Sequence, residues 1–178
     1  MSDKSVRTIS ISSGKGGVGK TTLTVNLAYC LSQMGKKVLI LDGDMSLANV
    51  DIFLKKTPEH TIQSFFDGDV TLPEILVKYS KNLHILPGAS GILQMTQLDV
   101  FQKKMLVDAV SQMEGDYDYL LIDTASGMAD EVLYLSSAAQ DVYVVIQPDP
   151  ASLTDSYALM KLLHQKYRMK SFSVITNE

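Results

Sequence analysis

Apolar runs rich in β-branched residues alternate along the whole chain with segments whose apolar positions repeat at helical spacing. The runs predict six strands, at residues 6–12, 37–42, 83–87, 117–123, 141–148 and 171–176. The intervening segments predict helices at residues 20–35, 61–66, 71–79, 96–113, 129–139 and 153–167. Gly35 is the expected glycine just after the first helix.

This alternation predicts an α/β fold in three layers, a mostly parallel sheet with helices on both faces. The run at residues 37–42 is apolar from Val38 to Leu41, as a strand buried on both faces of a sheet must be. A length of 178 residues suits one domain, so we expect a single domain over residues 1–178.

Residues 9–23 read ISISSGKGGVGKTTL and connect the first strand to the first helix through a glycine-rich loop. Gly14, Gly19, Lys20 and Thr21 fit G-x-x-x-x-G-K-[ST], the pattern of a phosphate-binding loop. Its backbone N–H groups turn toward an anion, and the helix that begins at Lys20 adds unpaired N–H groups of its own. Lys20 supplies a cation for the β- and γ-phosphates, and the Thr21 hydroxyl suits Mg²⁺.

Two other interpretations of the loop are weaker. Gly14, Gly16 and Gly19 also spell G-x-G-x-x-G, with Asp42 about twenty residues further on, as in a dinucleotide-binding unit. A dinucleotide loop, however, has no need of the Lys-Thr-Thr that follows Gly19. The other alternative is a glycine-rich turn with solvated lysines, but a match to the whole pattern rarely arises by chance.

Three aspartates lie at or just beyond the carboxyl ends of predicted strands, the edge at which open α/β sheets bind ligands. Asp123 follows an apolar strand, as does a carboxylate that holds Mg²⁺ directly or through water; a turn cap is the alternative. Asp42 and Asp44 are like charges so close together that they need a cation or hydrogen-bond donors. We expect Thr21, Asp42 and Asp123 at the metal and Asp44 at the attacking water.

The segment KGGVGKTT contains a second loop lysine, Lys15, and resembles the deviant Walker A motif of the MinD/ParA ATPases. The resemblance implies a P-loop ATPase domain that uses ATP or ADP with Mg²⁺. It also implies an ATP-dependent homodimer in which Lys15 reaches the partner's phosphates, as an arginine finger does. The residues expected to bind nucleotide are Gly14, Lys15, Gly16, Gly17, Val18, Gly19, Lys20, Thr21 and Thr22.

Phosphoryl transfer requires mainly positioning and neutralisation of negative charge. Lys15, Lys20 and Asp44 are therefore the expected catalytic residues. Ser126 and Gly127 are expected to form a switch with Asp44 and to sense the γ-phosphate through a backbone N–H.

Four blocks, LDGDMSLANVDIFL, LPGASGILQM, LIDTASGM and QPDPASLTDSYALMKLL, resemble the FlhG/FleN family of MinD-like ATPases, which set flagellar number and placement in bacteria. The resemblance implies a partner that is either the flagellar GTPase FlhF or a flagellar transcription activator. Only Met1 to Ser5 precede the first strand, where FlhF-stimulating members carry an additional helix, so the FleN type is favoured. Asn177 matches the family's adenine-reading asparagine.

Family members continue beyond the point that corresponds to Glu178, to an amphipathic membrane-binding helix. We therefore expect a C-terminally truncated form of the fold and no membrane association without that helix, although a full-length form would reach the inner face of the plasma membrane. A net charge of −4 argues against direct nucleic-acid binding. With a lone cysteine, Cys30, expected in the core, and no leader segment, the cytoplasm is the expected location.

Two alternatives to flagellar control remain open at this point. A ParA-like partitioning ATPase would share the loop and the fold. A nucleotide-dependent binding module would share the loop without significant hydrolysis.

Overall fold

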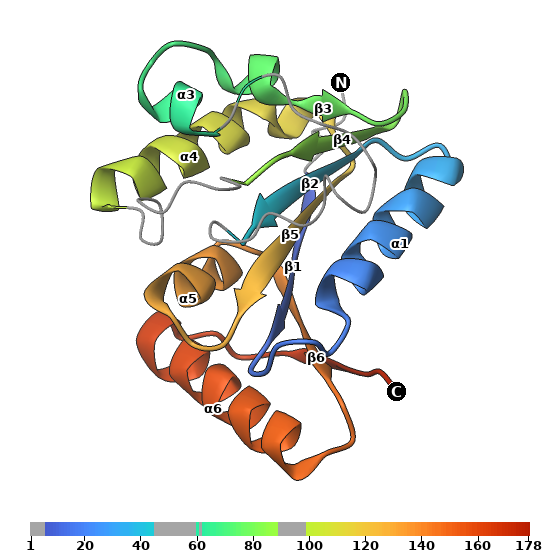
Figure 1. Ribbon diagram of the computed structural model, residues 1–178, viewed down its shortest axis with the longest axis vertical. Helices are drawn as coiled ribbons and strands as arrows, with labels where there is room; N and C mark the ends of the chain where they lie inside the picture. The colour runs from blue at the N-terminus through green and yellow to red at the C-terminus, as the bar shows by residue number, and fades with distance from the viewer. Residues whose placement is uncertain (1–5, 45–59, 61, 89–98) are drawn as a thin grey trace.

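The computed structural model describes residues 6–44, 60, 62–88 and 99–178, and these form one seven-stranded sheet flanked by helices (Figure 1). The strand order is β3-β4-β2-β5-β1-β6-β7, and only β3 runs antiparallel to its neighbour. The strands are β1 Arg7–Ser13, β2 Val38–Gly43, β3 Val77–Lys78, β4 Leu83–Leu86, β5 Tyr119–Ser126, β6 Asp141–Ile146 and β7 Ser173–Thr176. The predicted three-layer, mostly parallel α/β architecture is confirmed.

Among the described helices, α1 covers one face of the sheet, and α4, α5 and α6 cover the other (Figure 1). The helices are α1 Lys20–Gln33, α3 Ile62–Phe66, α4 Val100–Met113, α5 Asp130–Ser137 and α6 Pro150–Tyr167, with 3₁₀ turns η1 Leu72–Ile75 and η2 Glu114–Asp116. None of these helices is both long and apolar enough to cross a membrane, within the described part of the chain.

Alternate residues of the central strands enter opposite cores, as the period of a strand requires. Ile40 and Leu121 belong to the core under α1, whereas Leu41 and Ile122 belong to the core under α4 and α5. A third core joins β6 to α5 and α6. Both faces of β2 and β5 are therefore buried, which explains their continuous apolar sequences.

The parallel register brings the carboxyl ends of β1, β2 and β5 to one edge of the sheet. Asp42 of β2 lies opposite Asp123 of β5, and Ile11 of β1 lies opposite Asp123 on its other side. The loop that leaves β1 at Ser13 and returns as α1 therefore begins beside both aspartates.

The structure corrects four sequence-based predictions. Residues 71–79 form η1 and β3 instead of a helix. Thr71 and Glu74 cap the start of one short turn, but the backbone becomes extended at Leu76, because Val77 pairs with Ile85 in the sheet. The strand expected to end at residue 123, with a loop after it, instead continues as β5 to Ser126 alongside β1. Helix α6 begins at Pro150, earlier than expected. Residues 96–98, the expected start of α4, lie outside the described residues.

The fourth correction concerns Cys30, which is exposed rather than in the core. The buried line of α1 passes through Lys20, Thr24, Ala28 and Ser32, four residues apart. Cys30 is two positions from Ala28, so it points away from this line. The predicted role of Gly35 is confirmed: it follows α1 with φ of 80°.

Gly43 occupies a tightly packed position at the end of β2. A Cβ atom there would lie 2.8 Å from the Leu135 side chain of α5 and 3.0 Å from the carbonyl oxygen of Asp123. Helix α5 can approach the sheet this closely only because residue 43 has no side chain.

We expect Gly43→Ala to lower the free energy of unfolding by about 1–3 kcal/mol, because the added methyl group must displace α5 or the β2–β5 pairing. Denaturant titration followed by circular dichroism measures the change. Gly115→Ala is the matched control, since a Cβ at Gly115 meets no atom within 4 Å. Equal stability of the two variants would contradict the packing argument.

Candidate functional site

The loop between β1 and α1 has the backbone of an anion-binding turn. Gly17 and Gly19 have φ of 77° and 93°, in the left-handed region that only glycine adopts readily. Gly19 is the N-cap of α1 and provides no side chain to its first N–H groups. Those N–H groups have no acceptor within the helix, so they and the positive end of the helix dipole face the loop.

Gly14 fixes the other end of the loop against helix α6. A Cβ atom at Gly14 would collide with the backbone of Asp155 and Ser156, so no residue with a side chain fits. The Gly14 N–H also donates a long hydrogen bond, 3.4 Å, to the Ser156 hydroxyl. The loop is therefore packed directly on α6.

Lys20 is 9% exposed at the start of α1. Burial lowers the pKa of its ammonium group, while the nearby charges of Asp123 and Asp44 partly oppose that change. Lys20 is thus a buried cation at the start of α1, where the loop ends, and two nearby carboxylates favour its charged form. A phosphate group bound there would restore the favourable environment that burial removes.

Asp123 receives hydrogen bonds from two threonines of α1. Thr21 Oγ1 donates to its Oδ2 at 2.6 Å, and Thr24 Oγ1 lies 3.0 Å from its Oδ1. Asp123 is 2% exposed, and this burial raises the pKa of its carboxyl group; the two hydrogen bonds and the Lys20 charge oppose the rise. The structure therefore brings together Thr21 and Asp123, two of the three expected metal ligands.

Asp42, the third expected ligand, is buried opposite Asp123 in the sheet. The Asp44 N–H donates to Asp42 Oδ1 at 3.2 Å, so the backbone turns tightly after β2. Asp44 is partly exposed at the same edge, near enough for its charge to act on Lys20. Both acidic residues thus lie at the carboxyl edge where the sequence places them.

The expected switch residues lie against the phosphate loop. The Gly127 N–H donates to the Ser13 carbonyl oxygen at 2.9 Å, and Gly127 has φ of 98°. A Cβ atom at Gly16 would lie 3.4 Å from Ser126 Oγ, so Ser126 is close to the middle of the loop. The segment at Ser126 and Gly127 is therefore packed against the phosphate loop.

Asn177, the expected adenine contact, lies beneath the end of the loop. Its Nδ2 donates to the Val18 carbonyl oxygen at 2.9 Å, and its backbone N–H donates to the Ile146 carbonyl oxygen at 2.9 Å. A Cβ atom at Gly19 would collide with the Asn177 amide. Val18 is buried, and Thr22 is on the exposed side of the first turn of α1.

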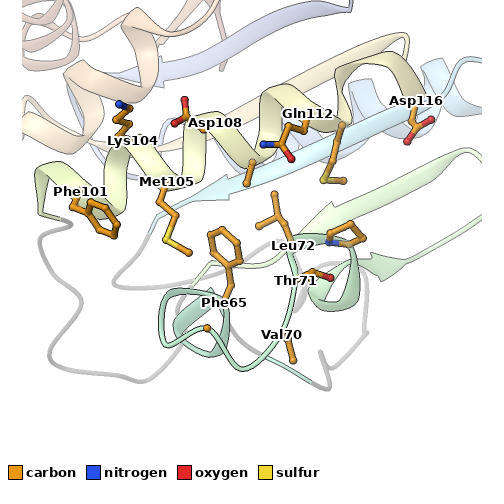
Figure 2. Close-up of a pocket in the computed structure, with 14 residues that line it drawn as sticks. Phe65, Val70, Thr71, Leu72, Phe101, Lys104, Met105, Asp108, Gln112 and Asp116 are labelled. Carbon is orange, nitrogen blue, oxygen red and sulfur yellow. The ribbon is translucent and has the colours of Figure 1, made fainter.

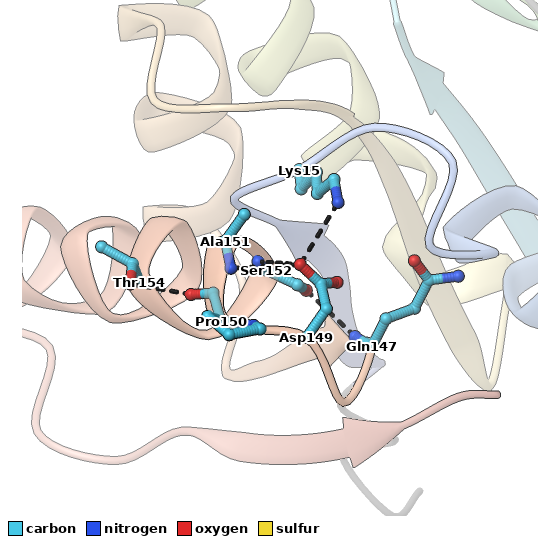
Figure 3. Close-up of polar contacts among 7 residues, drawn as sticks. All are labelled: Lys15, Gln147, Asp149, Pro150, Ala151, Ser152 and Thr154. Atoms are coloured by element: carbon cyan, nitrogen blue, oxygen red, sulfur yellow. Dashed lines mark hydrogen bonds and ion pairs between the residues drawn. The ribbon is translucent and has the colours of Figure 1, made fainter.

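Lys15 points toward helix α6, as Figure 3 shows. Its Nζ lies 3.3 Å from Asp149 Oδ1, and both side chains remain more than one-third exposed. The same oxygen accepts hydrogen bonds from the N–H groups of Ala151 and Ser152, so Asp149 is also the N-cap of α6. The hydrogen bond from the Ser152 N–H is the main reason that the pKa of Asp149 is lowered; Lys15 adds to the effect, and Ala151 contributes least.

Two contact residues were missed from the sequence, Thr24 and Asp149. Thr24 follows Thr21 by three positions and so shares its face of the helix, a spacing that could have indicated a common target. Asp149 precedes Pro150, and an aspartate before a helix-starting proline is a usual N-cap signal.

A cavity of about 820 Å³ lies away from the phosphate loop, between α4 and the segment that contains α3 and η1 (Figure 2). Mostly apolar side chains line it, including Phe65, Leu72 and Met105, and it shares no residue with the phosphate loop. The loop edge, with its N–H groups and converging charges, is therefore the candidate functional site.

The residues present suit magnesium held together with a nucleotide. No group of three or more His, Cys, Asp or Glu side chains gathers as a metal cage among the described residues. Mg²⁺ takes few ligands from such proteins, and water and phosphate oxygens complete its shell. The hard oxygens of Thr21 and Asp123, next to an anion-binding loop, meet that requirement.

Comparison with known proteins is consistent with this geometry. A family model described as an AAA domain matches residues 6–173. Antiactivator FleN of Pseudomonas aeruginosa is 41% identical over 172 residues, 97% of this chain and 61% of that protein. Flagellum site-determining protein YlxH of Helicobacter pylori is 34% identical over 86% of this chain and 52% of its own length.

Among solved structures, septum site-determining protein MinD of Pyrococcus horikoshii, complexed with Mg-ADP, has a TM-score of 0.75. It is 30% identical, and the alignment covers 95% of this chain and 68% of that one. The chain spans about half to three-fifths of the length of the two curated relatives. Its loop, its sheet order and these similarities agree, and the chain belongs to the FlhG/FleN group of the MinD/ParA family of P-loop ATPases.

Proposed function

We propose that this protein binds and hydrolyses ATP with Mg²⁺ and that ATP switches it between a monomer and a homodimer. The observation that carries the proposal is the loop itself. Lys20 is buried at the start of α1, where the charges of Asp123 and Asp44 act on it, while a second lysine, Lys15, is half-exposed and its ammonium group pairs with Asp149. We infer that the buried cation serves its own site and that the half-exposed cation is available to a second molecule.

Each residue has a part in the proposed reaction. The loop N–H groups and Lys20 bind the phosphates, and Thr21 and Asp123 would hold Mg²⁺, with Asp42 behind them. The metal would neutralise charge on the phosphate oxygens. Asp44, at the same edge, orients the attacking water. Ser126 and Gly127 follow the γ-phosphate because they contact the loop at Gly16 and Ser13.

A role for Lys15 in the partner's site follows from where its side chain lies. Its Nζ is directed at the start of α6, where it pairs with Asp149, and both side chains remain more than one-third exposed. Exposed ion pairs contribute little to stability, so the phosphates of a second molecule can compete for this lysine. Charge on a transferring phosphoryl group is stabilised in the same way by an arginine finger.

We also propose that the protein controls the number or placement of bacterial flagella from the cytoplasm. The support is similarity to an antiactivator, FleN, and to a flagellum site-determining protein, YlxH. The word antiactivator favours a transcription activator as the partner over the GTPase FlhF. The ATP-bound homodimer would be the form that binds this partner.

The two loop lysines are expected to separate binding from dimerisation. Lys20→Ala should abolish ATP binding, whereas Lys15→Ala should leave binding within about twofold and lose ATP-dependent dimers, because Lys20 is buried beside the charges of Asp123 and Asp44 whereas Lys15 pairs with Asp149 at the start of α6. Analytical ultracentrifugation with Mg²⁺ and either ADP or a non-hydrolysable ATP analogue measures both species. If the Lys15→Ala variant formed ATP-dependent dimers as readily as the wild type, the proposed role of Lys15 in the partner's site would be refuted.

Hydrolysis is expected to depend on Asp44. Asp44→Ala should reduce phosphate release by at least about a hundredfold while ADP binding persists, because the water loses its orienting carboxylate. Phosphate release is measured with and without EDTA, and the Gly115→Ala variant is the control for general damage. Wild-type phosphate release that is no higher than background would leave a binding module as the function.

In cells, the Lys15→Ala change in the full-length gene is expected to increase flagella per cell, since a protein that cannot dimerise no longer restrains the activator. Electron microscopy of negatively stained cells gives the count, with Gly115→Ala as the matched control. An unchanged count in a strain whose protein has lost its dimers would separate the biochemical switch from flagellar control.

A further inference from the structure

Thr24 lies one turn deeper in α1 than Thr21 and is completely buried. Its hydroxyl has two acceptors in reach, each at 3.0 Å: Asp123 Oδ1 and the Lys20 carbonyl oxygen. A threonine in a helix commonly donates to the carbonyl oxygen four residues earlier, so the Lys20 contact alone would indicate no special role for Thr24. The contact with Asp123 connects the helix interior to the carboxylate of the site.

The Thr24 hydroxyl has one proton to donate, and the Asp123 carboxylate is the stronger acceptor of the two. The Lys20 carbonyl, at the start of α1, already accepts the N–H of Thr24 in the α-helical pattern. Hydrogen bonds to an ionised carboxylate are roughly twice as strong as those between neutral groups. Thr24 therefore donates mainly to Asp123, and its back bond to Lys20 is secondary.

The two threonines together fix the orientation of the Asp123 carboxylate. Thr21 holds Oδ2 at 2.6 Å and Thr24 holds Oδ1 at 3.0 Å, so rotation of the carboxylate breaks both contacts. Thr21 is on the first turn of α1 and is partly exposed, whereas Thr24 is completely buried between α1 and the sheet. An incoming ligand can therefore reach the Thr21 hydroxyl but not the Thr24 hydroxyl.

We infer that Thr24 is a positioning residue for the magnesium-nucleotide site, acting through Asp123 and not by contact with metal or substrate. The inference rests on the proposed function, since it assumes that Asp123 serves Mg²⁺. Removal of a partner that orients a metal-binding carboxylate typically weakens metal affinity by 10–100-fold. Thr24 thereby makes the Mg²⁺ affinity of the site depend on how the second turn of α1 packs under the sheet.

The test measures Mg²⁺ dependence of nucleotide binding, without turnover. A fluorescent ADP derivative is titrated in EDTA and then at increasing Mg²⁺, for wild type, Thr24→Val and Thr24→Ser. Thr24→Val has nearly the same shape without the hydroxyl, and we expect it to need about tenfold more Mg²⁺ for the half-maximal effect. We expect its affinity in EDTA to stay within about twofold of wild type and Thr24→Ser to restore the Mg²⁺ response.

Thr154→Val is the matched control. Thr154 Oγ1 makes the same kind of back bond, to the Pro150 carbonyl oxygen at 2.8 Å, at an exposed position of α6 and with no carboxylate hydrogen-bonded to it among the described residues. It should leave the Mg²⁺ response unchanged. Thr24→Ala is measured in parallel, because it removes the hydroxyl without the second methyl group of valine, should that group misfit.

The remaining outcomes distinguish the inference from the function beneath it. A Thr24→Val or Thr24→Ala protein with the wild-type Mg²⁺ midpoint would overturn the inference and leave the proposed function standing. Equal losses of affinity in EDTA and in Mg²⁺ would show a merely structural threonine and also overturn it. Wild-type protein whose nucleotide binding ignores Mg²⁺ would overturn the metal role of Asp123 and the inference with it.

Discussion

The parallel pairing of β2, β5 and β1 is the constraint on which the site depends. It places Asp42 and Ile11 on either side of Asp123, so three chain segments end together at one edge. Gly43 and Gly14 then allow α5 and α6 to pack against that edge without a side chain between. A sheet shifted by one residue would turn Asp123 to the opposite face and leave the loop without its carboxylate.

Burial sets the electrostatics of this edge. It lowers the pKa of Lys20 and raises the pKa of Asp123, which means that the charged forms of both groups are stabilised less than they would be in water. Their mutual attraction, with the Thr21 and Thr24 hydrogen bonds, only partly offsets this. A ligand that brings phosphate oxygens and a divalent cation supplies what both groups lack, so the site favours occupation by a metal-bound anion.

The sequence predicted most of the fold because its signals are local. Strand β2 is apolar throughout its middle, and the loop pattern fixes glycines and lysines at set positions. Contacts between distant segments were harder to predict. The extension of β5 to Ser126 depends on pairing with β1, and the exposure of Cys30 depends on which line of α1 meets the sheet. Thr24 was missed for the same reason, since its partner is about a hundred residues away.

Asp149 is a shared acceptor, with one oxygen serving the N–H groups of Ala151 and Ser152 as well as the Lys15 ammonium group. The backbone hydrogen bonds hold this carboxylate at the start of α6 whether or not Lys15 is present. If Lys15 turned to another anion, as the proposed dimer requires, α6 would keep its cap while its first turn lost one neighbouring positive charge. The electrostatic potential at the start of α6 would then depend on where this loop lysine lies.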